Sequence, residues 1–203
     1  MDQVNKLIGR AIAAAMALAI AAAPAAAQQY SDGYNFIKAV KARDGIKVTE
    51  LVSRPGTTVI NSKDRDTGDG ALHILARGRD YDWTSFLLGK RANPNIQNSQ
   101  GDTPLSIAAQ IGWLEGAQIL LSHGAAADLA NSRGETPLIM AVHQRDVGMV
   151  RLLLGNGANP KKTDNAAGYS AIDYARQDSR AQMIVKLLEA ASGPARPVAG
   201  PKL

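Results

Sequence analysis

The sequence predicts an all-α repeat solenoid, in which stacked helix–turn–helix units share one continuous core. Two observations lead to this prediction. Blocks of residues recur every 33 positions along the 203-residue chain, a period typical of helical repeat proteins. Hydrophobic residues make up 45% of the chain but aromatic residues only 4%. A core so poor in rings must be filled by Ala, Leu, Ile and Val, which suits helix-on-helix packing.

The N-terminal segment has the three parts of a secretory signal peptide. Lys6 and Arg10 form a basic start, residues 11–23 are an unbroken apolar run, and small residues lead up to a cut after Ala27. The alternative is a membrane anchor, but crossing a bilayer takes about 20 apolar residues. We therefore predict a cleaved signal peptide over residues 1–27, no membrane insertion after cleavage, and a periplasmic or secreted protein of bacterial type.

The repeat itself is defined by three groups of residues that recur at the same spacing. The pairs are Thr103–Leu105 with Thr136–Leu138, Leu120–Leu121 with Leu153–Leu154, and Gly124–Ala125 with Gly157–Ala158. In the next repeat, Ser170–Ile172 follows Thr136–Leu138 after 34 residues, because one residue is inserted near residues 165–167. So many coincidences at one period indicate a true internal repeat.

Each period has the same physical plan. A Thr or Ser can cap the first helix by accepting a hydrogen bond from a free amide, and Pro is suited to the next position. A short helix follows, then a break such as Ile111–Gly112 or Arg145–Asp146. The second helix ends in Leu-Leu, after which Gly124 or Gly157 can adopt the left-handed conformation of a C-terminal cap.

The segment that carries this plan, GDTPLSIAAQIGWLEGAQILLSHGAAADLANSR (residues 101–133), closely resembles the ankyrin repeat. The signature of that family is a G-x-TPLH-x-AA opening and an LL-x-x-GA closing. The resemblance extends from Asp69 to Ala190 and, more loosely, to residues 31–54. It implies antiparallel helix pairs in an L-shaped solenoid, with hairpin loops that project from one edge.

The resemblance divides the chain into seven segments. We expect a signal peptide (1–27), an N-terminal capping helix pair with a long loop (28–68), a degenerate repeat (69–100), two clean repeats (101–133 and 134–167), a C-terminal capping repeat (168–191) and a disordered tail (192–203). His73 keeps the motif histidine and is expected to be structural, whereas Ser106, Ile139 and Asp173 replace it. Gly70 replaces the capping Thr, which should weaken that helix start.

As a function, the resemblance implies non-catalytic binding of a protein through the concave face of the first helices and the hairpin tips. The repeat register points to Arg77, Gln110, His143 and Gln177 on the helices. The tips lie at residues 63–67, 98–100, 131–133 and 163–165, and are represented by Asn98, Ser132 and Asp164. Trp113 either packs over a turn or anchors the interface, and Trp83 is expected to pack in the core.

No residue pattern indicates a cofactor or catalytic chemistry. The chain has no cysteine, and His73, His123 and His143 occupy unrelated repeat positions, which argues against zinc. The loop at residues 64–70 lacks the Gly at position six and the Glu at position twelve of a calcium-binding loop. Much of the net charge of +5 lies in the terminal segments, so a nucleic-acid partner is not expected.

We therefore expect a monomeric binding protein that is not an enzyme, with a partner of unknown identity. Two alternatives stay open. The chain could be a secreted effector that acts on a host protein, although a cleaved signal argues against injection in one step. It could also be an enzyme, which activity in the purified mature chain would reveal.

Overall fold

The computed structural model describes residues 32–192 and contains only helices and loops in that range. The chain divides after Ser62 into two compact units. The predicted signal peptide and residues 193–203 of the predicted tail lie outside the described residues. Isolated β-bridges join Lys63 to Gly70 and Thr163 to Ser170, but no described residue belongs to a strand. The all-α prediction is confirmed.

The first unit contains a helix over residues 32–42, the α-helix α2 (Gly45–Ser53) and the 3-10 helix η1 (Val59–Asn61). Asp44 caps α2 by accepting a hydrogen bond from the Lys47 amide at 3.0 Å. Phe36 and Leu51 are buried in this unit. The expected helix pair therefore forms, and these apolar side chains are buried.

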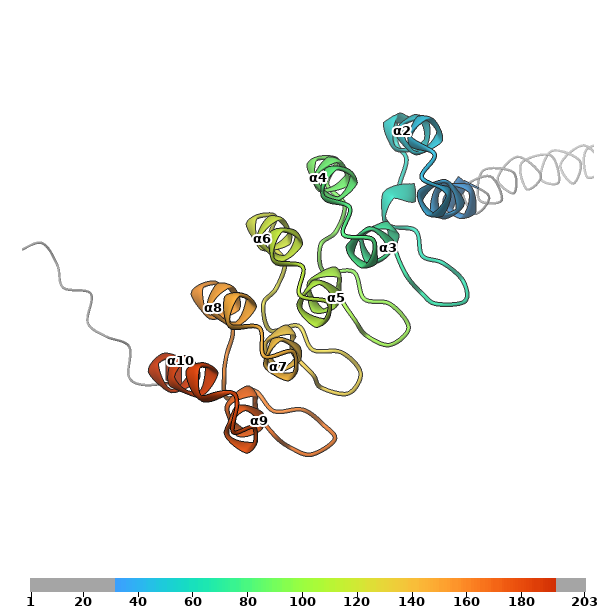
Figure 1. The fold of residues 1–203 in the computed structure, drawn as a ribbon. Coiled ribbons are helices and arrows are strands. Elements are labelled where there is room, and N and C mark those ends of the chain that lie inside the picture. The colour runs from blue at the N-terminus through green and yellow to red at the C-terminus, as the bar shows by residue number, and fades with distance from the viewer. Residues whose placement is uncertain (1–31, 193–203) are drawn as a thin grey trace, which may run out of the picture. The chain divides into compact units, whose positions relative to one another are not determined.

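The second unit consists of four helix pairs. They are α3 (Ala71–Arg77) with α4 (Tyr81–Gly89), α5 (Pro104–Gln110) with α6 (Leu114–Ser122), α7 (Pro137–His143) with α8 (Val147–Gly155), and α9 (Ala171–Gln177) with α10 (Gln182–Ser192). The first helices contact one another in sequence, and so do the second helices (Figure 1). This unit is the predicted solenoid.

The first helices begin where the capping residues predict. Thr103 and Thr136 accept hydrogen bonds from the amides of Ser106 and Ile139, at 3.0 and 3.2 Å. Ser170 does the same for Asp173 at 3.4 Å. Each of these helices is seven residues long, so their last residues occupy one equivalent position along the unit.

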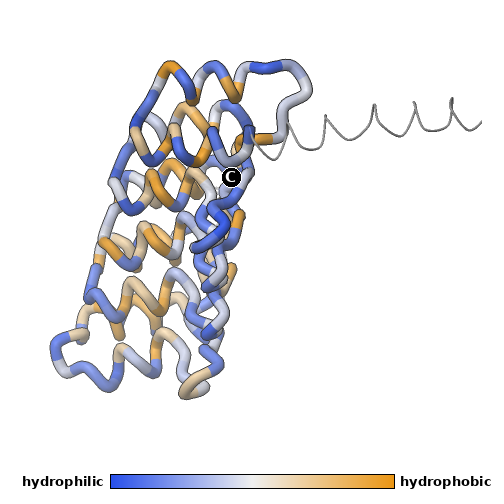
Figure 2. Tube along the Cα trace, turned by 90° about the vertical axis from the view of Figure 1, so that its right-hand side faces the viewer, coloured by the Kyte–Doolittle hydropathy of each residue, from blue (hydrophilic) through white to orange (hydrophobic). Residues whose placement is uncertain are grey.

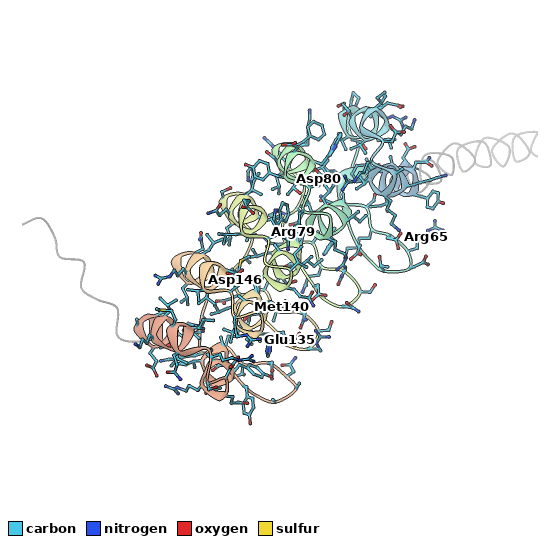
Figure 3. All side chains as sticks on the ribbon, viewed as in Figure 1. Arg65, Arg79, Asp80, Glu135, Met140 and Asp146 are labelled. Atoms are coloured by element: carbon cyan, nitrogen blue, oxygen red, sulfur yellow. The ribbon has the colours of Figure 1, made fainter. Side chains whose placement is uncertain are left out.

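Two of the second helices, α4 and α8, are capped by an aspartate that the sequence analysis did not identify as a cap. Asp80 and Asp146, both labelled in Figure 3, accept hydrogen bonds from the amides of Trp83 and Met149. The two distances are 3.2 and 2.9 Å. Gly124 and Gly157 end α6 and α8 with φ of 86° and 85°. These glycines confirm the predicted left-handed caps, because φ in this range strains residues that carry a Cβ.

The core lies between the two rows of helices. Leu120 and Leu153, from the repeated Leu-Leu pairs, are both 0% exposed. Each helix carries both hydrophobic and hydrophilic residues (Figure 2), as expected where only one side of a helix is buried. The equivalent residues Leu72, Leu105, Leu138 and Ile172 are buried in all four pairs, so successive repeats share a continuous apolar core.

The hairpin loops are tied to one another by backbone hydrogen bonds. The amides of Ser99, Ser132 and Asn165 donate to the carbonyls of Thr67, Gln100 and Arg133, at 3.1, 3.0 and 2.8 Å. The loops project from the row of first helices (Figure 1). Each loop is thus held in place by its predecessor, which makes the loop edge an ordered surface.

Candidate functional site

The four predicted helix residues form a regular row. Arg77, Gln110, His143 and Gln177 are the last residues of α3, α5, α7 and α9, and all four are exposed. Because these helices pack side by side, the four side chains repeat along one face of the unit. We call this the first-helix face.

Arg77 differs from the other three because it is already paired. Its Nη2 donates to Oδ1 and Oδ2 of Asp69, at 3.0 and 3.1 Å. Asp69 lies two residues before the start of α3, so this ion pair joins the loop to the end of the helix that follows. The carboxylate is mostly buried and the guanidinium is half exposed, which leaves Arg77 available at the surface.

Two of the three predicted tip residues are buried, so their expected exposure was wrong. Ser132 is exposed, but Asn98 is 9% and Asp164 5% exposed. Their side chains build the loops: Asn98 Oδ1 accepts from the amides of Gln100 and Asp102, and Asp164 Oδ1 accepts from those of residues 166–168. A short polar side chain that folds back on its own loop cannot also project from it.

Trp113 is also buried, at 4% exposure, so its packing role is supported and the interface-anchor role is not. It precedes α6, at the position where α4 and α8 have a capping Asp. Its ring lies directly against Gly116, since a Cβ on that glycine would fall 1.9 Å from Trp113 Cε3. Trp83, predicted to pack in the core, is only partly buried and contacts Phe86 edge to face at 5.2 Å.

His73 has the predicted structural role. It is 0% exposed, its Nδ1 accepts from the Gly70 amide at 3.0 Å, and its Nε2 donates to the Asp102 carbonyl of the next repeat at 2.8 Å. Burial lowers the pKa of this imidazole, which favours the neutral ring that both bonds require. The side chain thereby stabilises the start of α3, where Gly70 has no capping side chain, and links this repeat to the next.

A ladder of asparagine side chains also connects the repeats, and the sequence analysis missed it. The Nδ2 of Asn98 donates to Asp69 Oδ1 at 2.8 Å, and the Nδ2 of Asn131 donates to Asp102 Oδ1 at 3.1 Å. The third step would place residue 164 against Glu135, but Asp164 has no hydrogen to donate. The ladder therefore ends between the last two repeats.

Asp164 instead accepts a hydrogen bond from the Tyr174 hydroxyl. This bond lowers the pKa of the Asp164 carboxyl and raises the pKa of Tyr174 to about 12. The Tyr174 ring also packs edge to face against the rings of His143 and Tyr169. The ring centroids are 4.5 Å apart for His143 and 5.5 Å apart for Tyr169. An aromatic cluster on the last two repeats was not predicted, because His143 and Tyr174 belong to different repeats and meet only when the repeats stack.

The loop at residues 64–70 is held in shape by the side chain of Asp64. Asp64 Oδ1 accepts from the amides of Asp66 and Thr67 and from the Thr67 hydroxyl, each at 3.1 Å. Among residues 32–192, no group of three His, Cys, Asp or Glu side chains is arranged to hold a metal ion. Over the same range, no helix has both the length and the apolar character needed to cross a membrane.

Comparison with known families now agrees with this geometry. A family model described as "Ankyrin repeats (3 copies)" matches residues 36–130, 72–164 and 117–193. The chain belongs to the ankyrin-repeat family. Ankyrin repeats are generally protein-interaction modules and are typically non-catalytic.

Two curated proteins are similar over part of this ankyrin-repeat chain. A transient receptor potential cation channel subfamily A member 1 homolog of Caenorhabditis elegans is 34% identical over 85 residues, 41% of this chain and 7% of that protein. The nuclear factor NF-kappa-B p110 subunit of Drosophila melanogaster is 38% identical over 52 residues, 26% of this chain and 5% of that protein. The chain thus spans less than a tenth of either relative.

Proposed function

We propose that this ankyrin-repeat protein is an exported, non-catalytic scaffold that binds a protein partner through its first-helix face and the adjoining loops. The observation that carries the proposal is that the repeats share the same type of residue at a buried position but differ at an exposed one. At the buried position the repeats hold Leu72, Leu105, Leu138 and Ile172, whereas at the exposed position they hold Arg, Gln, His and Gln. A constant frame with variable exposed side chains is what partner recognition requires.

The order of the loops supports the same surface. Backbone bonds between successive loops hold the loop edge in place before any partner binds. Such preorganisation lowers the conformational entropy lost on binding. Export is proposed from the N-terminal sequence alone, and the periplasm or the extracellular space are the compartments that it implies.

Site-specific photo-crosslinking in the native cell tests the proposed face. A photoreactive amino acid replaces Gln110 or Gln177 on the first helices in one set of chains, and Gln118 on the outer side of α6 in the control. Gln110 and Gln118 belong to one repeat and are both exposed, so only the face differs. We expect the same adduct from positions 110 and 177 and none from position 118. Adducts from position 118 alone would move binding to the outer helices.

A further inference from the structure

The last two repeats carry exposed aromatic rings next to carboxylates. Tyr169 is 42% exposed, His143 is exposed and Tyr174 is half-buried. The rings of His143 and Tyr169 each contact the ring of Tyr174. Glu135, two residues before α7, and Asp164 lie beside them (Figure 3 labels Glu135). We call these five residues the carboxylate-aromatic patch.

The charge of this patch is not balanced. Glu135 is paired with Arg133, whose Nη2 lies 2.6 Å from Oε2. Asp164, by contrast, forms no ion pair with any residue in the range 32–192, and its hydrogen bonds come from a hydroxyl and backbone amides. One negative charge therefore stays uncompensated, and because Asp164 is buried, its field is screened less than that of a surface carboxylate.

The first repeat shows how the same register position accommodates a cation. Asp69 and Arg77 occupy the positions of Glu135 and His143, and there the carboxylate binds the guanidinium through both oxygens. The third repeat keeps the acid but has His143 in place of the arginine, and the fourth has Tyr169 and Gln177. At the register positions of Asp69 and Arg77, the last two repeats therefore have no arginine.

We propose that the carboxylate-aromatic patch seats an Arg or Lys side chain of the bound partner. This inference rests on the proposed function and specifies the partner as one with an exposed basic segment. A cation over an aromatic face is stabilised by the ring quadrupole, most strongly where water is partly excluded. The hydrogen bond from Tyr174 to Asp164 adds electron density to one of these rings, and an acidic or phosphorylated segment would be repelled by the carboxylates.

A random peptide library displayed on phage and selected on the full chain tests the proposal. We expect the enriched peptides to share an Arg or Lys, and a synthetic copy in which Gln replaces that residue to bind about tenfold more weakly. The unsubstituted peptide, which keeps its Arg or Lys, should bind Tyr169→Ala and Asp164→Asn about tenfold more weakly than it binds the unsubstituted chain. Asp164→Asn restores the residue type found at positions 98 and 131, and Tyr169 is exposed, so both variants should keep the fold by circular dichroism.

Matched controls lie on α4, where Tyr81 and Asp82 are exposed. Tyr81→Ala and Asp82→Asn remove the same chemical groups away from the patch and should leave binding unchanged. Peptides that lose binding with Gln110→Ala but not with Tyr169→Ala or Asp164→Asn would overturn this inference and leave the proposed face standing. Peptides that lose binding only with the α4 variants would overturn the proposed function as well.

Discussion

The side-chain amide of Asn98 donates a hydrogen bond to the carboxylate of Asp69 in the preceding repeat, over 2.8 Å. Both residues are buried, so the bond crosses the repeat interface with little competition from water. Asn131 and Asp102 form the next bond of the same kind. Both bonds require a side chain that can donate a hydrogen bond at positions 98 and 131.

Asn98→Asp should test this requirement directly. The substitution sets two carboxylates against each other in a buried site, and we expect it to lower the free energy of unfolding at neutral pH by about 2–3 kcal/mol. The loss should shrink below about pH 4, where one carboxyl is protonated and can donate again. Urea unfolding at the two pH values measures both effects. An equal loss at both would show that the ladder bond is not the cause.

Gly116→Ala should test the packing of Trp113. The new methyl group would meet the indole ring, and overpacking of this kind costs about 1–3 kcal/mol. Gly155→Ala is the matched control in α8, because a Cβ there meets nothing within 4 Å. That variant should be neutral or more stable by up to about 1 kcal/mol. Thermal unfolding of the two variants distinguishes the sites, and equal stability would contradict the packing described for Trp113.

The hydrogen bond between Tyr174 and Asp164 should make folding stability depend on pH at both acid and alkaline pH. The pKa of Asp164 is lowered, so its contribution to stability is present above the unfolded pKa of about 3.9 and is lost as pH falls through the folded value. The pKa of Tyr174 is raised from 10.0 to about 12, so its contribution is present below the unfolded value and is lost as pH rises toward 12.

Tyr174→Phe removes the hydroxyl and keeps the ring. It should therefore abolish the loss of folding stability at alkaline pH and reduce the loss of stability at acid pH. Phenolate absorbance should show one tyrosine titrating near pH 12 in the unsubstituted chain and none in the variant. Tyr81→Phe is the control and should leave this late titration in place. A late titration that persists in Tyr174→Phe would assign it to another tyrosine.

Export predicts a new N-terminus. Sequencing of the chain recovered from the cell envelope or medium should begin at Gln28, because the apolar run and the small residues before it form a cleavable signal. Replacing Ala27 with a bulky residue should slow processing and leave the longer precursor. A chain that keeps Met1 and stays in the cytoplasm would contradict the proposed compartment.

The helices and their order could be predicted from the sequence because the determinants are local. A capping Thr acts on an amide three residues away, and the Leu-Leu pair recurs with the period of the helix pair. The same register correctly placed Arg77, Gln110, His143 and Gln177 on the surface. Each of these assignments needs only the repeat spacing and the hydrogen bonds within one turn.

The sequence by itself determined the repeat, the caps of its first helices and the buried leucines, whereas the tertiary structure decided which loop side chains and which aromatic rings are buried. Asn98 finds its partner 29 residues away, across an interface that exists only once the repeats stack. Trp113 is buried because Gly116 leaves room for its ring, and His143 meets Tyr174 only across two adjacent first helices. Such contacts depend on packing between repeats, and a pattern read within one repeat does not contain them.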